Sequence, residues 1–168
     1  SLDSTMSYEK IKLLHKNDFF ITGKVTRIDV KNQLLRVDLG NNIEGIMPFR
    51  DATIYPIYDD GGNLSPNIFK LAGRIIRAEI VCSDNDSIIL SRRLSMLKAL
   101  TFLKKQTEVS FASITDFSRV SAFIDIGYGI IGRCYAKDFS NIKYENIQDI
   151  GIKKDSIISV KILAYDEE

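Results

Sequence analysis

Short runs of alternating or branched apolar residues, separated by turn residues, fill the first half of the chain. Period-two alternation of β-branched and aromatic residues is typical of strands, and clusters of Gly, Asn and Asp mark turns between them. Pro48 should end the third run, because proline cannot donate a backbone hydrogen bond. A long irregular connection over 51–71 separates the third and fourth runs. The pattern predicts strands at 19–30, 34–39, 43–47, 73–82 and 87–91.

Two stretches read as helices. Residues 94–106 lack glycine and proline, and leucines recur at every third position from Leu94 to Leu103. This stretch is apolar around most of its circumference, so we expect a helix buried between two bodies. A shorter lead-in helix is expected over 8–16, where Ile11 and Leu14 share one face.

The pattern of the first half returns in the second, with strands predicted at 109–115, 120–126, 130–135 and 155–164. Aligning Gly40 with Gly127 also brings Gly45 onto Gly132, because the two glycines are five residues apart in each half. Such self-similarity indicates a tandem repeat of one small β domain. We expect the second copy to be cut short at Glu168, near the beginning of its last strand.

Five short strands with a long third-to-fourth connection describe an OB-type barrel. The sequence therefore predicts a mainly β protein with two five-stranded OB-fold barrels in tandem, joined by an α-helix. The predicted parts are a lead-in helix over 1–17, a first domain over 18–93, a joining helix over 94–107 and a second domain over 108–168.

The composition argues against a membrane-spanning, a disulfide-bonded and a metal-binding protein. The chain has 168 residues, of which 45% are hydrophobic and 27% charged, as in globular proteins. No apolar run approaches the roughly 20 residues of a membrane-spanning helix, so we expect no membrane partner. Cys82 and Cys134 stand far apart and the chain has one histidine, so neither a disulfide nor a metal site is expected. Unpaired cysteines and no visible export signal favour a cytoplasmic protein.

Motifs of catalysis are missing from the sequence. It contains no Ser-His-Asp set, nucleophile elbow, paired catalytic carboxylates or Walker motif. Residues 127–132 do fit G-x-G-x-x-G, but a dinucleotide site needs a helix to begin there, and the sequence continues as a β-rich run. We interpret these glycines as a tight turn and a strand packing point. No enzyme activity, cofactor or small-molecule substrate is therefore expected.

Four segments of the first half occur in an informative order: GKVTRI ending at Ile28, VDLG ending at Gly40, EGIMP ending at Pro48 and ILSRR ending at Arg93. Together they resemble the S1 RNA-binding domain family, as in ribosomal protein S1. The resemblance covers about residues 18–93 and 108–168, and the stretch between them is similar to the linker helix of consecutive S1 domains. It implies single-stranded RNA binding on one barrel face, through aromatic rings that stack on bases and basic residues that hold phosphates.

The resemblance distributes the expected site unequally between the two copies. In the second copy, Phe123 takes the aromatic position of the second strand. Arg133 stands where the third-strand aromatic is expected, and Tyr135 where a histidine or aromatic follows. An arginine can still stack on a base through its planar guanidinium. The first copy has Arg36, Ile46 and Pro48 at these positions, so it lacks the aromatic platform.

Basic residues complete the predicted site. Arg92 and Arg93 match the basic residues that close the family's domain, and with Arg36 and Lys105 they are expected to contact the RNA backbone. The predicted RNA-binding residues are Phe123, Arg133, Tyr135, Arg36, Arg92, Arg93 and Lys105. The expected partner is single-stranded RNA, with the ribosome as a second partner, in translation or RNA metabolism.

Charge keeps a second hypothesis open. The chain carries a net charge of +1, but residues 108–168 have seven basic and ten acidic side chains, whereas residues 18–93 have ten of each. The copy with the aromatic residues is thus acidic, which opposes phosphate binding unless Lys104 and Lys105 lie beside its face. The alternative is a protein-interaction module that docks on the ribosome or another assembly without binding RNA.

Overall fold

The computed structural model describes residues 7, 9–11, 20–83, 87–105, 108–127, 129–139 and 153–162. The chain divides into two compact units, Ser1–Lys98 and Ala99–Glu168, called unit 1 and unit 2 below. The described residues are mainly β, as predicted. None of the helices within the described ranges has the length and apolar character to cross a membrane.

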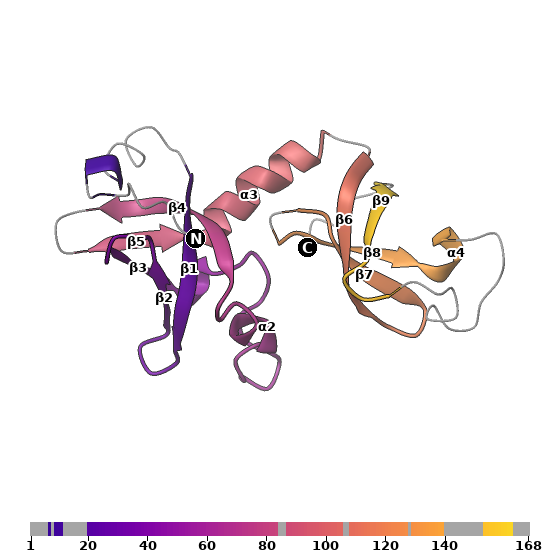
Figure 1. Ribbon diagram of the computed structural model, residues 1–168. Coiled ribbons are helices and arrows are strands. Elements are labelled where there is room, and N and C mark those ends of the chain that lie inside the picture. The colour runs from indigo at the N-terminus through magenta and orange to yellow at the C-terminus, as the bar shows by residue number, and fades with distance from the viewer. Residues whose placement is uncertain are drawn as a thin grey trace. The chain divides into compact units, whose positions relative to one another are not determined.

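Unit 1 contains a closed five-stranded barrel (Figure 1). Its strands are β1 (Phe20–Asp29), β2 (Leu34–Asp38), β3 (Glu44–Pro48), β4 (Ile75–Ser83) and β5 (Ile88–Ser91), in the order β1-β2-β3-β5-β4. The pairs are antiparallel except for β3 and β5, which run parallel. All five strands predicted for the first half are confirmed, and they form an OB-like barrel.

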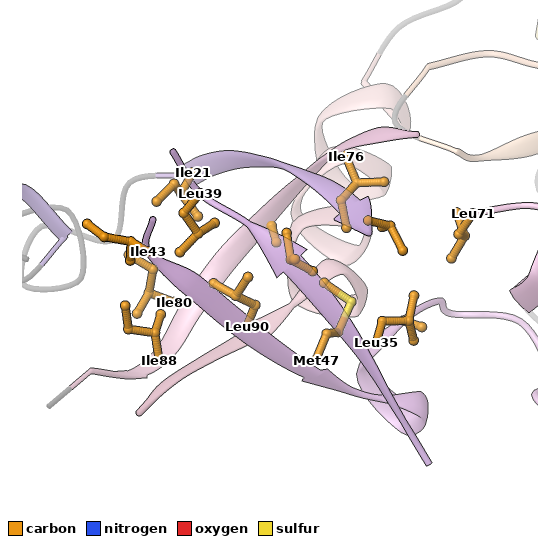
Figure 2. Close-up of a cluster of buried hydrophobic side chains, with 14 of the residues drawn as sticks. Ile21, Leu35, Leu39, Ile43, Met47, Leu71, Ile76, Ile80, Ile88 and Leu90 are labelled. Carbon is orange, nitrogen blue, oxygen red and sulfur yellow. The ribbon is translucent and has the colours of Figure 1, made fainter. Parts of the chain in front are cut away.

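The barrel core follows from the alternation along each strand. In β2, the two inward residues Leu35 and Val37 are fully buried, while their neighbours are partly exposed. Apolar side chains from all five strands converge in one cluster inside the barrel (Figure 2). Ile68 and Leu71, from the long connection, join the same cluster. The connection therefore helps to close the core.

That connection has its own short elements. Pro48 ends β3 as predicted, and the 3₁₀ helix η1 (Phe49–Asp51) follows it. Farther along, the single turn α2 (Pro66–Phe69) begins at Ser65, whose hydroxyl accepts the backbone N–H of Asn67. Of the predicted lead-in helix, only 9–11 are described; they are helical, and Ile11 is buried in the barrel's cluster.

Unit 2 contains a four-stranded antiparallel sheet. Its strands are β6 (Glu108–Phe117), β7 (Ser121–Asp125), β8 (Ile131–Tyr135) and β9 (Ile157–Lys161), in the order β8-β7-β6-β9, and the turn α4 (Ala136–Phe139) follows β8. The four strands predicted for the second half are confirmed. Their order is that of β3-β2-β1-β4 in unit 1. Within the described residues, unit 2 is thus a four-stranded sheet, and the second OB-fold barrel, which the sequence predicts to be cut short at its last strand, is not confirmed.

A bulge in the first hairpin occurs at corresponding places in both units. The β1–β2 register shifts between Val25 and Arg27, and the β6–β7 register shifts between Ile114 and Asp116. The residue in the bulge is a threonine each time. The Thr26 hydroxyl donates to the carbonyl of Arg36 at 3.3 Å, and the Thr115 hydroxyl donates to the carbonyl of Phe123 at 3.2 Å. The bulges place Arg36 and Phe123 equivalently in the two sheets.

The next turn is also repeated. The backbone N–H of Gly40 donates to the Asp38 carboxylate, and that of Gly127 donates to the Asp125 carboxylate, each at 2.8 Å. Both glycines have positive φ, 94° and 119°, which explains the residue type. A strand, β8, follows Gly127 and its turn at 131–135. The G-x-G-x-x-G match is therefore a strand-to-strand turn, as predicted, because a dinucleotide site needs a helix there.

Helix α3 (Arg92–Leu103) begins two residues before the predicted start, directly after β5. Met96 is buried, but Leu94, Leu97 and Phe102 are 40%, 39% and 56% exposed. The prediction of a helix buried around most of its circumference is therefore wrong at these three positions. Leucines at every third residue drift by about 60° per step around a helix with 3.6 residues per turn, so the row from Leu94 to Leu103 passes from one side of the helix to the other.

Polar contacts fix the first turns of α3 to β4. The Ser95 hydroxyl donates to the carbonyl of Arg77 at 3.0 Å. One turn later, the Lys98 ammonium pairs with the carboxylate of Glu79, whose side chain is only 10% exposed. A carboxylate that is so buried needs a cation beside it.

Replacing Lys98 with methionine is therefore expected to destabilise unit 1 by about 1–2 kcal/mol, between the values for exposed and fully buried pairs. Thermal unfolding followed by circular dichroism measures this change. Lys70→Met is the matched control, because Lys70 is exposed and makes no ion pair within the described residues. Adding Glu79→Gln to Lys98→Met should restore part of the loss; a double variant less stable than Lys98→Met would contradict this explanation.

Candidate nucleic-acid interface

Phe123 lies on the outer face of the unit 2 sheet. Its neighbours on β7, Ala122 and Ile124, are buried in the apolar cluster of that unit. Because side chains alternate along a strand, Phe123 points to the opposite face, where it is partly buried. Across the hairpin, the exposed Asp116 of β6 stands opposite Phe123. The sequence prediction that Phe123 points outward is therefore confirmed.

Arg133 and Tyr135 reach the same outer face from β8. They are exposed, whereas Cys134 between them packs against the apolar cluster. Phe123 pairs directly with Arg133 across the two strands, so their side chains lie next to each other.

Burial and the nearby Asp138 charge raise the pKa of the Cys134 thiol, so this side chain stays neutral and packs as a small apolar residue.

The Arg133 guanidinium bridges the two aromatic rings. Its Cζ lies over the Phe123 ring, 4.8 Å from the ring centroid, and 5.9 Å from the centroid of Tyr135. Both distances fall within the range of cation–π attraction. The three residues that the sequence grouped by position thus form one cluster in space.

Lys137 is a fourth member of this cluster that the sequence analysis missed. Its Nζ lies 6.0 Å from the centroid of the Tyr135 ring. Lys137 belongs to α4, yet it continues the spacing of two residues that Arg133 and Tyr135 begin. This spacing is the sequence signal from which Lys137 could have been included in the predicted site. We call the four residues Phe123, Arg133, Tyr135 and Lys137 the β7–β8 face.

The Arg133 guanidinium makes no hydrogen bond or ion pair within the described residues, and it lies close to the two rings. Its guanidinium N–H groups, five in any arginine, remain available to an acceptor from solution. The face therefore combines aromatic surface with two cations on a unit that is otherwise rich in acidic residues.

Arg36, the unit 1 counterpart of Phe123, is differently placed. Its Nη1 lies 2.8 Å from the Glu44 carboxylate and its Nη2 lies 3.6 Å from the Asp29 carboxylate. Hydrogen bonds from the side chain and backbone of Asn32, together with the charges of Arg27 and Arg36, lower the pKa of Asp29. Asp29 thus stays ionised and holds Arg36. A phosphate would have to compete with two carboxylates for this arginine.

Arg92 and Arg93 contact the long connection of unit 1. Arg92 Nη1 donates to the carbonyl of Ala52 at 2.9 Å, and Arg93 Nη1 donates to the carbonyl of Thr53 at 3.4 Å. Both arginines thereby tie the segment after η1 to the beginning of α3. These bonds give the two residues a structural role that the sequence did not indicate.

Lys105 is exposed just beyond the end of α3. The hypothesis that Lys104 and Lys105 lie beside the β7–β8 face stays a prediction. Of the seven predicted site residues, the structure brings together Phe123, Arg133 and Tyr135 and places Arg36, Arg92 and Arg93 in other contacts.

Comparison with known proteins adds little to this geometry. No protein-family model matches the sequence, and no curated protein does. One solved structure to which the chain is similar is the a/eIF2alpha-aDim2p-rRNA complex from Pyrococcus horikoshii OT3. The TM-score is 0.36 at 20% sequence identity, and the similarity covers 52% of this chain and 52% of the matched chain. The chain thus spans about half the length of the matched chain.

Proposed function

We propose that this protein binds single-stranded RNA, without catalysis, on the β7–β8 face of unit 2. The supporting observation is the Arg133 guanidinium, which lies against the Phe123 and Tyr135 rings and has no carboxylate partner within the described residues. Unpaired bases stack on aromatic rings and on guanidinium groups, while cations neutralise the phosphates between them. The chemistry of the face fits both needs.

The finer parts of the proposal come from the sequence. The four sequence segments GKVTRI, VDLG, EGIMP and ILSRR, in this order along the first half, support membership of the S1 RNA-binding domain family. The equivalent hydrogen bonds of Thr26 and Thr115 support a repeat of one domain. We extend this to two S1-type OB domains in tandem, acting in the cytoplasm in translation or RNA metabolism, with the ribosome as a further partner.

RNA binding is tested first by fluorescence anisotropy of a labelled, unstructured RNA of about a dozen nucleotides. We expect saturable binding that weakens with salt. Each phosphate neutralised on a single strand contributes a slope of about −0.7 to log K against log salt, so two cations, Arg133 and Lys137, predict a slope of about −1.4. No binding at low salt would contradict the proposal.

A protein-docking function is the second candidate, and one observation favours it. Arg36 of unit 1 is held by Glu44 and Asp29, and Ile46 stands beside it where the family has an aromatic. The barrel therefore offers no aromatic platform at this place. Association with purified ribosomes that persists at high salt, in a protein that does not bind the RNA oligonucleotide, would support docking, because apolar interfaces depend weakly on salt.

A further inference from the structure

We infer that a base of the bound RNA stacks on the Arg133 guanidinium rather than directly on Phe123, and that the β7–β8 face therefore prefers purines. This inference rests on the proposed RNA-binding function and assigns the ligand class and the residue that selects it.

Arg133 forms the outer layer of the β7–β8 face, and Phe123 lies beneath it. Phe123 is partly buried, Arg133 is exposed, and the guanidinium carbon lies over the Phe123 ring at 4.8 Å from its centroid. A base that approaches from solvent meets the guanidinium before the ring. Direct stacking on Phe123 requires Arg133 to move away, which breaks its contacts with both Phe123 and Tyr135.

The Arg133 guanidinium is held by aromatic rings and not by an ion pair within the described residues. Two rings contact its guanidinium, but no carboxylate pairs with it within the described residues. Arg36, at the position equivalent to Phe123 in unit 1, is instead engaged by two carboxylates. Arg133 thus keeps its full charge and its free N–H groups while the rings limit its motion.

The guanidinium group can contact a base and a phosphate at the same time. The group is flat, so its face can stack on a base while its edge donates hydrogen bonds to a neighbouring phosphate. A lysine ammonium supplies the same charge but has no flat face. Preferences of such sites follow stacking strength, and the larger purine ring covers more of the guanidinium than a pyrimidine does.

The test compares the full chain with its Arg133→Lys variant, using twelve-nucleotide oligo(A) and oligo(U) RNA in anisotropy titrations. The unchanged protein should bind oligo(A) at least fivefold more tightly than oligo(U). Arg133→Lys should weaken oligo(A) binding at least tenfold and leave the salt slope unchanged, because the charge remains. Arg119→Lys is the matched control, since Arg119 is exposed on the same unit and outside the β7–β8 face.

Nuclear magnetic resonance supplies a readout that affinity does not. Ring current from a stacked base should shift the Arg133 Nε–H signal upfield, by more than it shifts the Phe123 ring protons. Arg133→Lys binding equal to that of the unchanged protein, or a larger shift at Phe123 than at Arg133, would overturn the inference and leave RNA binding intact. Absence of RNA binding by the unchanged protein would instead overturn the proposed function.

Discussion

The variant that combines Phe123→Ala with Tyr135→Ala is expected to bind single-stranded RNA about a hundredfold more weakly than the unchanged chain. Both rings contact the Arg133 guanidinium, so their removal takes away its support as well as the aromatic surface. Loss of a stacking platform costs about 1–3 kcal/mol per base, and a hundredfold change corresponds to about 2.7 kcal/mol. Anisotropy titration with the same labelled RNA measures the change.

A matched control is available in unit 1. Tyr58 and Phe69 are 47% and 49% exposed on the long connection, so Tyr58→Ala with Phe69→Ala removes one tyrosine and one phenylalanine elsewhere. This control should bind RNA like the unchanged chain. Equal loss in both double variants would show that the effect does not belong to the β7–β8 face. Because Phe123 is partly buried, circular dichroism melting must first show that each variant is folded.

Gly23→Ala is expected to destabilise unit 1 by about 2–3 kcal/mol, the upper part of the range for overpacked cores. A Cβ at Gly23 would collide with Val37, and would lie 2.9 Å from Leu39 Cδ2 and 3.0 Å from the Asp38 carbonyl oxygen. Val37 and Leu39 are fully buried, so they have no space to move into. For a domain of this size we expect the melting temperature to fall by roughly 10 °C or more.

Gly132→Ala in unit 2 provides the comparison for this prediction. There, a Cβ would lie 3.7 Å from Ile126 Cγ2 and 3.8 Å from the Ile124 carbonyl oxygen, which are ordinary contacts. The substitution should leave stability nearly unchanged. Amide hydrogen exchange, which follows the two units separately, would show whether protection falls in the barrel alone. Equal losses in the two variants would mean that steric fit at Gly23 does not explain its residue type.

The strands could be predicted because their signals are local. Alternating apolar residues and the glycine, asparagine and proline residues between them mark each strand in turn, and Pro48 ends β3 as its chemistry requires. The same local signals recur around Gly40 and Gly127, where the structure repeats even the hydrogen bond to the preceding aspartate. The outward direction of Phe123 followed from the same alternation.

Other features depend on which side chains meet across strands, and the sequence analysis did not settle these. The ion pairs of Arg36 join residues that lie on three different strands. Arg92 and Arg93 were predicted to contact the RNA backbone, but their guanidinium groups contact backbone carbonyls 40 positions away in sequence. Likewise, the position of Arg133 over Phe123 depends on the pairing of β7 with β8, and Lys137 joins them from a helical turn.

The anchoring of α3 on β4 also determines where the barrel can be separated from the rest of the chain. A fragment that stops at Arg93, where the predicted first domain ends two residues after β5, would lack Ser95 and Lys98. The Glu79 carboxylate would then lose its cation, and the Arg77 carbonyl would lose a donor. A shortened form of unit 1 therefore has to retain the first two turns of α3.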